Sequence, residues 1–125
     1  MRTIIFRAQP IYEQEIKVKD FVHGDLIQYA NGQIGIRQQE TGYEMDVNPK
    51  TVGQFTGLLD KNGNEIYEGD IVKPNIKYIT RNCQVVFDSL CFKLATKEWT
   101  NWFSEHVWLE LEVIGNIFEN PELLQ

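Results

Sequence analysis

Two Asn-Gly pairs, at residues 31–32 and 62–63, interrupt short segments in which apolar and polar residues alternate. Asn and Gly tolerate the positive φ angles of a two-residue primed turn, and alternation is the pattern of a strand with one buried face. The segments concerned are 26–36 and 55–67. The two pairs therefore predict two β-hairpins.

Alternation also predicts strands in the second half of the chain. Residues 83–94 alternate on both sides of Asp88-Ser89, which indicates a third hairpin. Between residues 107 and 113 every second side chain is aliphatic, and Glu110 and Glu112 lie between them, so we expect a half-buried strand that turns Glu110 and Glu112 to the solvent. The aliphatic side chains expected in the core are Val107, Leu109, Leu111 and Val113.

Helical signals are confined to two places. An apolar stripe at i, i+3, i+4 and i+7 predicts one short helix, formed by Trp99, Trp102, Phe103 and His106. Asn120-Pro121 predicts a helical turn near the C-terminus, because Asn caps helices and Pro suits the first helical position. Short strands between tight turns, with so little helix, favour a small barrel or a pair of packed sheets over a parallel α/β fold.

Asn48-Pro49 carries the same helix-start signal but is followed by Thr51, Val52 and Gly53, so we expect only a turn there. We take this turn as the boundary between an N-terminal β region, 1–50, and a C-terminal domain, 51–125. A chain of 125 residues is one compact domain or two small lobes. Its hydrophobic share of 42% predicts a packed core rather than a disordered chain.

The formal net charge of −6 comes from acidic residues scattered along the chain. A nucleic-acid binder needs a face dense in Lys and Arg to displace counterions, and Lys73, Lys77 and Arg81 are the nearest approach to one. Nucleic-acid binding is therefore an alternative that we do not favour. No apolar run approaches the roughly 20 residues that span a bilayer, so we expect a cytoplasmic protein without a membrane partner.

Only two cysteines occur, Cys83 and Cys91, and in a hairpin they would lie at different distances from the turn. We therefore expect free, partly buried thiols. A nucleophilic pair of Cys83 with His106 remains an alternative that only the fold can test, because such partners meet in space.

Longer motifs suggest a family. Residues 55–72, FTGLLDKNGNEIYEGDIV, closely resemble the signature of the YopX family of phage and prophage proteins, and residues 112–124, EVIGNIFENPELL, resemble its C-terminal signature. Phe6-Arg7-Ala8 matches the usual opening of the family and residues 86–92 its middle strand pair, although Gln9 stands where an aromatic residue is expected.

The resemblance is strongest over residues 51–125. It implies a C-terminal lobe shaped like a small Src-homology-type β-barrel, a variable N-terminal β region with hairpins, and a phage origin inside a bacterial host. It implies no activity.

Three carboxylates, Glu65, Glu68 and Asp70, lie within six residues, which is the composition of a metal or acid/base site. We interpret Glu68-Gly69-Asp70 instead as a turn, in which Gly supplies a positive φ and Asp accepts a nearby backbone N–H. The competing hypothesis is a small metal-dependent or hydrolytic enzyme that uses Glu68, Asp70 and His106. We assign structural roles in turns and bends to Gly57, Asn62, Gly63, Glu68, Gly69, Asp70, Gly115 and Asn116.

The segment 99–108 is the densest in aromatic residues, and large rings usually pack in the core of a small domain. Exposed rings there would mark a binding surface. The sequence contains none of the common phosphate-loop, hydrolase or zinc-protease motifs. We therefore predict no catalytic residue, metal or cofactor, and a non-catalytic accessory module that binds an unknown host or phage protein, with homo-oligomers possible. The binding candidates are Trp99, Trp102, Lys73 and Lys77.

Overall fold

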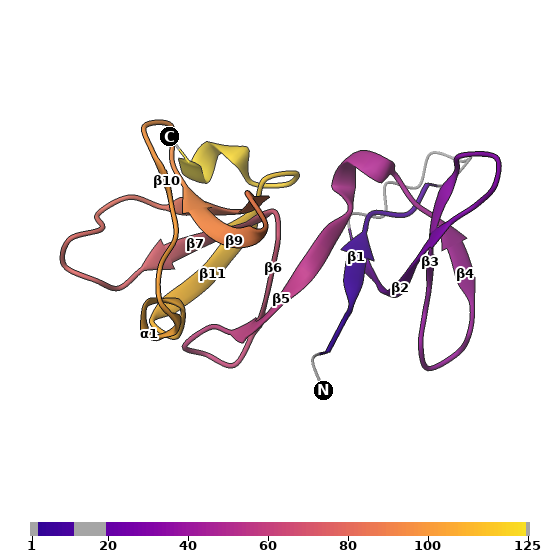
Figure 1. Ribbon diagram of the computed structural model, residues 1–125, viewed down its shortest axis with the longest axis horizontal. Helices are drawn as coiled ribbons and strands as arrows, with labels where there is room; N and C mark the ends of the chain where they lie inside the picture. The colour runs from indigo at the N-terminus through magenta and orange to yellow at the C-terminus, as the bar shows by residue number, and fades with distance from the viewer. Residues whose placement is uncertain (1–2, 12–19, 125) are drawn as a thin grey trace. The chain divides into compact units, whose positions relative to one another are not determined.

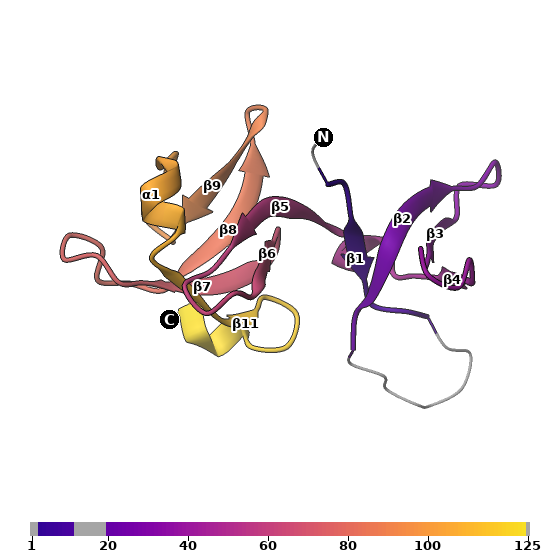
Figure 2. The same cartoon turned by 90° about the horizontal axis from the view of Figure 1, so that it is seen from below.

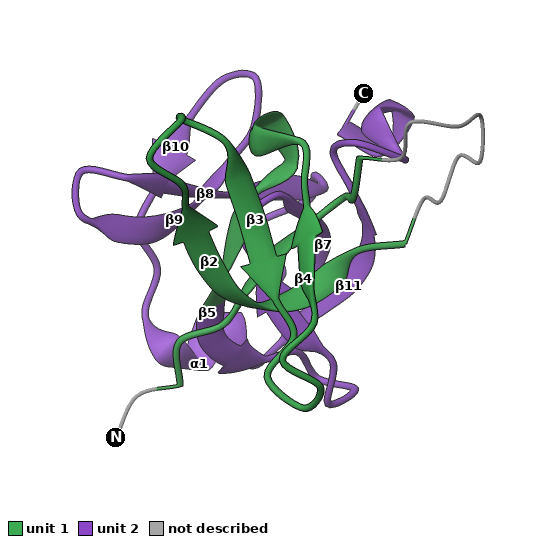
Figure 3. Cartoon of the chain, turned by 90° about the vertical axis from the view of Figure 1, so that its right-hand side faces the viewer, with its two compact units in different colours: residues 1–55 green, residues 56–125 purple. Residues whose placement is uncertain are grey.

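The computed structural model describes residues 3–11 and 20–124. These residues form mainly β structure in two antiparallel sheets, which confirms the predicted fold class at that level. Strand pairing among them leaves both sheets open. The chain divides into two compact units, Met1–Phe55 and Thr56–Gln125, which are coloured separately in Figure 3.

Unit 1 is an antiparallel sheet in which β3 and β2 lie between β4 and β1, and β1 pairs in turn with the first residues of β5 (Figure 1). Its core contains Ala8, Ile36 and Val47, all fully buried or nearly so. Asn48 starts a short helical turn by accepting the N–H of Lys50 at 3.1 Å. The elements are β1 (Phe6–Ala8), β2 (Val22–Gln28), β3 (Ile34–Arg37), β4 (Glu44–Asp46), the 3₁₀ helix η1 (Pro49–Thr51) and the start of β5 (Gly53–Leu59).

Unit 2 contains a five-stranded antiparallel sheet with the order β10-β9-β8-β7-β11, together with β6, which pairs with β5 (Figures 1 and 2). Within unit 2, one hydrophobic core connects the five-stranded sheet with the β5–β6 pair. Ile66 of β6 and Leu58 of β5 pack there with Val72, Val85 and Leu94 of the sheet. The elements are the rest of β5, β6 (Glu65–Tyr67), β7 (Asp70–Pro74), β8 (Cys83–Asp88), β9 (Cys91–Ala95), β10 (Thr100–Asn101), α1 (Glu105–Trp108), β11 (Leu111–Asn116) and the 3₁₀ helix η2 (Pro121–Leu124).

The predicted hairpins at both Asn-Gly pairs are confirmed, but the primed turn geometry is wrong. In the first, the N–H of Tyr29 bonds to the carbonyl of Gln33 at 2.9 Å, so three residues form the loop. Gly32 has a φ of 87°, whereas Asn31 is not among the residues with positive φ. Asn31 instead accepts the N–H of Gln33 with its side chain at 3.0 Å. This is a tight turn closed by one left-handed glycine.

The turn at residues 60–64 repeats that geometry, with an Asp60 N–H bond to the Asn64 carbonyl at 2.7 Å and a φ of 85° at Gly63. The third predicted hairpin, β8–β9, is also confirmed, and its register pairs Asp88 with Cys91. Its two loop residues, Ser89 and Leu90, both have positive φ, at 50° and 72°. The two-residue turn with positive φ angles therefore occurs where the sequence contains neither Asn nor Gly.

Two predicted elements between residues 99 and 113 are wrong. The helix expected over residues 99–106 is replaced by strand β10 and the short helix α1, because Trp99 closes the β9–β10 hairpin through its carbonyl, which accepts the N–H of Thr96 at 2.8 Å. The strand expected from residue 107 begins only at Leu111. Val107 belongs to α1 and is buried, whereas Leu109 is 49% exposed. An alternating pattern was thus produced by a helical turn followed by a strand.

Candidate functional site

The three tryptophans of unit 2 have different environments. Trp108 is buried on α1 and donates its ring N–H to the carbonyl of Phe103 at 3.2 Å. Trp99 is half-buried, with its ring 5.9 Å from that of Phe103 in an edge-to-face contact. Trp102 is 66% exposed. Of the two tryptophans predicted as binding candidates, Trp99 packs inward and Trp102 faces the solvent.

Trp102 lines an open groove of about 380 Å³, which we call the Trp102 groove. Its wall is mostly apolar, and Glu105 is its only charged residue among the residues that the structure describes. The lining comes from β5, β9, α1 and the segment before α1, and consists of Thr56, Leu58, Cys91, Phe92, Trp102, Phe103, Glu105 and Trp108. Sequence reasoning identified the aromatic segment but not Leu58 or Phe92, because these reach the groove only through strand pairing and packing.

Apolar surface continues beyond the groove onto the β8–β9 hairpin. The rings of Phe87 and Phe92 pack edge to face with their centroids 5.1 Å apart, and Phe87 is 49% exposed. Leu90, at the tip of the hairpin, is 92% exposed and is held in a backbone conformation that costs a branched L-residue free energy. Large apolar side chains that remain in water at the edge of an apolar groove are typical of binding surfaces.

The turn at Glu68-Gly69-Asp70 has the predicted geometry. Gly69 has a φ of 93°, and the carboxylate of Asp70 accepts the N–H of Tyr67 at 2.7 Å. Asp70 is only 2% exposed, so its carboxylate lies in the protein interior. His106, in contrast, is exposed on α1 beside the hydroxyl of Ser104 at 2.9 Å. In the described part of the chain, no three His, Cys, Asp or Glu side chains group as metal ligands, so Glu68, Asp70 and His106 are not brought together.

Asp60 is a structural residue that the sequence analysis missed. It is 5% exposed and accepts the backbone N–H groups of Asn62 and Asn64 in its own turn. Its second oxygen accepts the N–H of Val113 at 2.9 Å, which ties the β5–β6 turn to β11. Burial alone would raise the pKa of Asp60, but these N–H groups outweigh it and hold the pKa below its ordinary value. Its partner 53 residues away left no local signal.

The other motif residues also lie at bends. Gly57 has a φ of 89° within β5. A Cβ on Gly115 would approach the side-chain oxygen of Asn120 to 2.6 Å, which only glycine avoids. Asn116 accepts the N–H groups of Phe118 and Glu119 at 3.0 Å each. These contacts are structural and close the turn before η2.

The basic residues of unit 2 mostly stand beside carboxylates. Lys73 lies opposite Glu112 in the β7–β11 register, and Lys61 pairs with the same Glu112 at 3.6 Å. Lys93 pairs with Asp88 at 3.5 Å. Lys77 is exposed in the connection between β7 and β8. Such an arrangement offsets positive charge instead of concentrating it.

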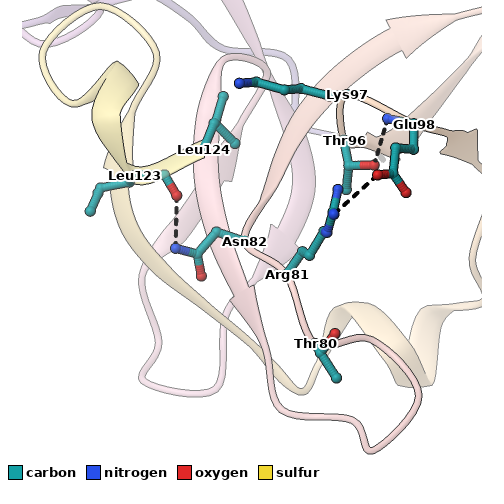
Figure 4. Close-up of a pocket in the computed structure, with 8 residues that line it drawn as sticks. All are labelled: Thr80, Arg81, Asn82, Thr96, Lys97, Glu98, Leu123 and Leu124. Carbon is teal, nitrogen blue, oxygen red and sulfur yellow. Dashed lines mark hydrogen bonds and ion pairs between the residues drawn. The ribbon is translucent and has the colours of Figure 1, made fainter.

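A second, polar pocket of about 470 Å³ lies between the start of β8, the β9–β10 loop and η2 (Figure 4). Arg81 pairs with Glu98 across it at 3.1 Å, and Asn82 donates to the carbonyl of Leu123 at 2.9 Å. Both members of the ion pair are more than half exposed, so the pair contributes little free energy. The polar side chains of Arg81, Asn82 and Glu98 are thus already bonded within the pocket wall.

The thiols agree with the expectation of free cysteines, Cys83 buried and Cys91 half-buried. Burial raises the pKa of Cys83 to about 11, so this thiol is neutral and a poor nucleophile near neutral pH. The Cys83 thiol donates a hydrogen bond to the carbonyl of Arg81. The alternative of a Cys83–His106 nucleophilic pair therefore has no support from the environment of the thiol.

The fold and these contacts define a small, mainly antiparallel β protein with two compact units. The model of the family described as YopX protein matches residues 6–125, so the chain belongs to the YopX family, as the motifs had indicated. Comparison with curated proteins finds no match. None of the helices in the described residues is long and apolar enough to cross a bilayer.

Solved structures agree in fold. The crystal structure of protein EF1440 from Enterococcus faecalis is 26% identical, with a TM-score of 0.59 over 100% of both chains. The X-ray structure of protein yopX from Bacillus subtilis is 23% identical, with a TM-score of 0.58 over 100% of both chains. Neither description states an activity.

Proposed function

We propose that this protein is a non-catalytic protein-binding module that acts through the Trp102 groove. The observation that carries the proposal is the 66% exposure of Trp102 at the mouth of an apolar groove. Tryptophan is enriched among interface hot spots, because its large ring buries much surface with little loss of rotamer freedom. The partner is a protein of the phage or of its host, met in the cytoplasm of a bacterium.

Photo-crosslinking tests this function directly. The exchange Trp102→p-benzoylphenylalanine in the full chain, expressed in lysogenic or infected cells, should yield an adduct with one defined protein. Tyr78→p-benzoylphenylalanine is the matched control, since Tyr78 is 70% exposed in unit 2 but does not line the groove. Equal adducts at both positions would contradict the proposal.

The identified partner then permits a quantitative test. Purified partner should bind the Trp102→Ala variant at least about tenfold more weakly than wild type, while Tyr78→Ala should bind normally. Neither exposed ring contributes to the core, so both variants should keep the wild-type melting temperature. Equal affinity for wild type and Trp102→Ala would show that the groove is not the binding surface.

Nucleic-acid binding through Lys73, Lys77, Lys93 and exposed aromatics is the less supported alternative. Residues 56–125 contain six Lys and Arg and eleven Asp and Glu, a net charge of −5 that repels phosphates. Glu112 lies directly opposite Lys73 in the β7–β11 register, which lowers the positive potential around that lysine. Retention on DNA or RNA that falls steeply with salt would favour this alternative.

We also propose that unit 2 is a partly open relative of the Src-homology-type barrel expected for residues 51–125. The support is that Leu58 and Ile66, on β5 and β6, share one core with Val72 and Val85 of the five-stranded sheet. Two β layers around a single core are the basis of small barrels and rolls. Such scaffolds commonly host binding, which is an analogy at the level of the fold.

A further inference from the structure

The two edges of the five-stranded sheet differ. The β11 edge is covered from within the unit, because the carbonyl of Leu111 accepts the N–H of Lys61 at 2.9 Å and the N–H of Val113 donates to Asp60 at 2.9 Å. The outward backbone groups of Leu111 and Val113 at this edge are therefore engaged.

The opposite edge, β10, is open. Thr100 and Asn101 pair with Ala95 and Leu94 of β9, and within residues 3–11 and 20–124 no strand pairs with their other side. Both residues are exposed. Proteins limit pairing at such an edge by keeping the strand very short or by placing Pro, Lys or a bulge on it; β10 is only two residues long, but it carries no Pro, Lys or bulge. The backbone groups on the outer side of this short edge are a template for a short stretch of one more strand.

This edge leads directly into the Trp102 groove. Trp102 follows β10 in the chain, and Phe92 of the paired strand β9 lines the same groove. Side chains of an added strand alternate between its two faces with a rise of about 3.3 Å per residue. Every second side chain would therefore face the groove, while the other side chains would point away.

The charge around the groove also favours one kind of binding segment over another. Glu105 is the only charged residue that lines the described groove, and the unit as a whole is acidic. A basic side chain next to the apolar ones would gain from this field, whereas an acidic segment would be repelled. The groove and the edge thus favour an apolar segment that carries Lys or Arg.

We propose that an extended segment of the partner protein adds as a strand to the β10 edge, places alternate apolar side chains in the Trp102 groove and sets a Lys or Arg near Glu105. This inference rests on the proposed function and specifies how binding occurs. Main-chain hydrogen bonds to β10 supply affinity, and the groove supplies specificity.

The test is selection of random dodecapeptides displayed on phage against the full chain, with counter-selection on Trp102→Ala. Selected peptides should show alternating apolar residues with at least one Lys or Arg. Synthetic copies should bind Glu105→Lys at least about tenfold more weakly than wild type, whereas Tyr78→Ala should bind as wild type does.

N-methylation then tests the strand pairing. In an added strand, alternate N–H groups face β10 and the others face away. Two versions of each peptide, N-methylated at odd or at even positions, should therefore differ, with one losing binding and the other retaining it. If binding depends on Trp102 but both N-methylated versions bind equally well, strand addition is overturned and the proposed function stands. The same conclusion follows if the bound peptide is helical. Failure to obtain any Trp102-dependent peptide would overturn both.

Discussion

Asp70 and Gly69 hold the turn between β6 and β7 by two local devices, a carboxylate bonded to the N–H of Tyr67 and a positive φ of 93°. Gly69→Val should lower the free energy of unfolding by about 1–3 kcal/mol, because a β-branched residue is strained in that region. Asp70→Ala should lower it by about 1–3 kcal/mol, because it leaves a buried N–H without its acceptor. Thermal and urea unfolding of the full chain measure both losses.

Asp70→Asn is the matched control for this turn. Its side-chain oxygen can still accept the N–H of Tyr67, so its loss of stability should be clearly smaller than that of Asp70→Ala. A functional carboxylate would behave differently, since such groups are often held at some expense of stability. An unchanged or raised melting temperature for Asp70→Ala would therefore argue against the structural role of this turn.

Asp60 should make stability depend on pH. Its pKa is lowered in the folded state, so its contribution is fully present above the ordinary aspartate value of about 3.9 and is lost as the pH falls through the folded value. The difference in unfolding free energy between wild type and Asp60→Asn should be largest near pH 6 and should shrink below about pH 4. A difference that stays constant down to about pH 3 would show that the Asp60 charge does not stabilise the fold.

At the scale of elements, the β8–β9 hairpin has an unfavourable turn. Leu90 has a φ of 72° and is 92% exposed, so its side chain contributes almost no packing. Leu90→Gly should raise the free energy of unfolding by about 1 kcal/mol, because glycine adopts this conformation without strain. Denaturant unfolding curves measure the gain.

Leu90→Ala separates the backbone effect from loss of the side chain. Alanine removes most of the leucine side chain but keeps the strain of a positive φ, so its stability should stay close to that of wild type. Equal stabilisation by glycine and alanine would mean that exposure of the leucine, and not the backbone conformation, disfavours this turn.

For the whole molecule, the two units differ in the size of their cores. Among the described residues, the unit 2 core joins β6, β7, β8, β9, α1 and β11, whereas the unit 1 core rests on Ala8, Ile36 and Val47. A fragment of residues 53–125, which keeps β5 intact, should therefore unfold cooperatively on heating. A fragment of residues 1–55 should not, because so short a chain buries too little apolar surface. Circular dichroism melting curves that show the reverse order would contradict this view of the cores.

Local features were predictable from the sequence because their interactions close within a few residues. The hairpins at both Asn-Gly pairs, the Glu68-Gly69-Asp70 turn and the helical turn after Asn120 depend on φ preferences and on hydrogen bonds that span two to four residues. The motifs of residues 55–72 and 112–124 also sufficed to indicate the family.

Only the tertiary structure decided which side chains are buried by segments that lie far away in the sequence. Trp99, Trp102 and Trp108 look alike in sequence, yet their burial depends on strands that arrive from elsewhere, and so Trp102 alone of the three is exposed. The same dependence moved the start of β11 to Leu111, placed Val113 against Asp60 and brought Leu58 to the groove. Burial is a property of contacts between segments far apart along the chain, and local pattern carries no record of them.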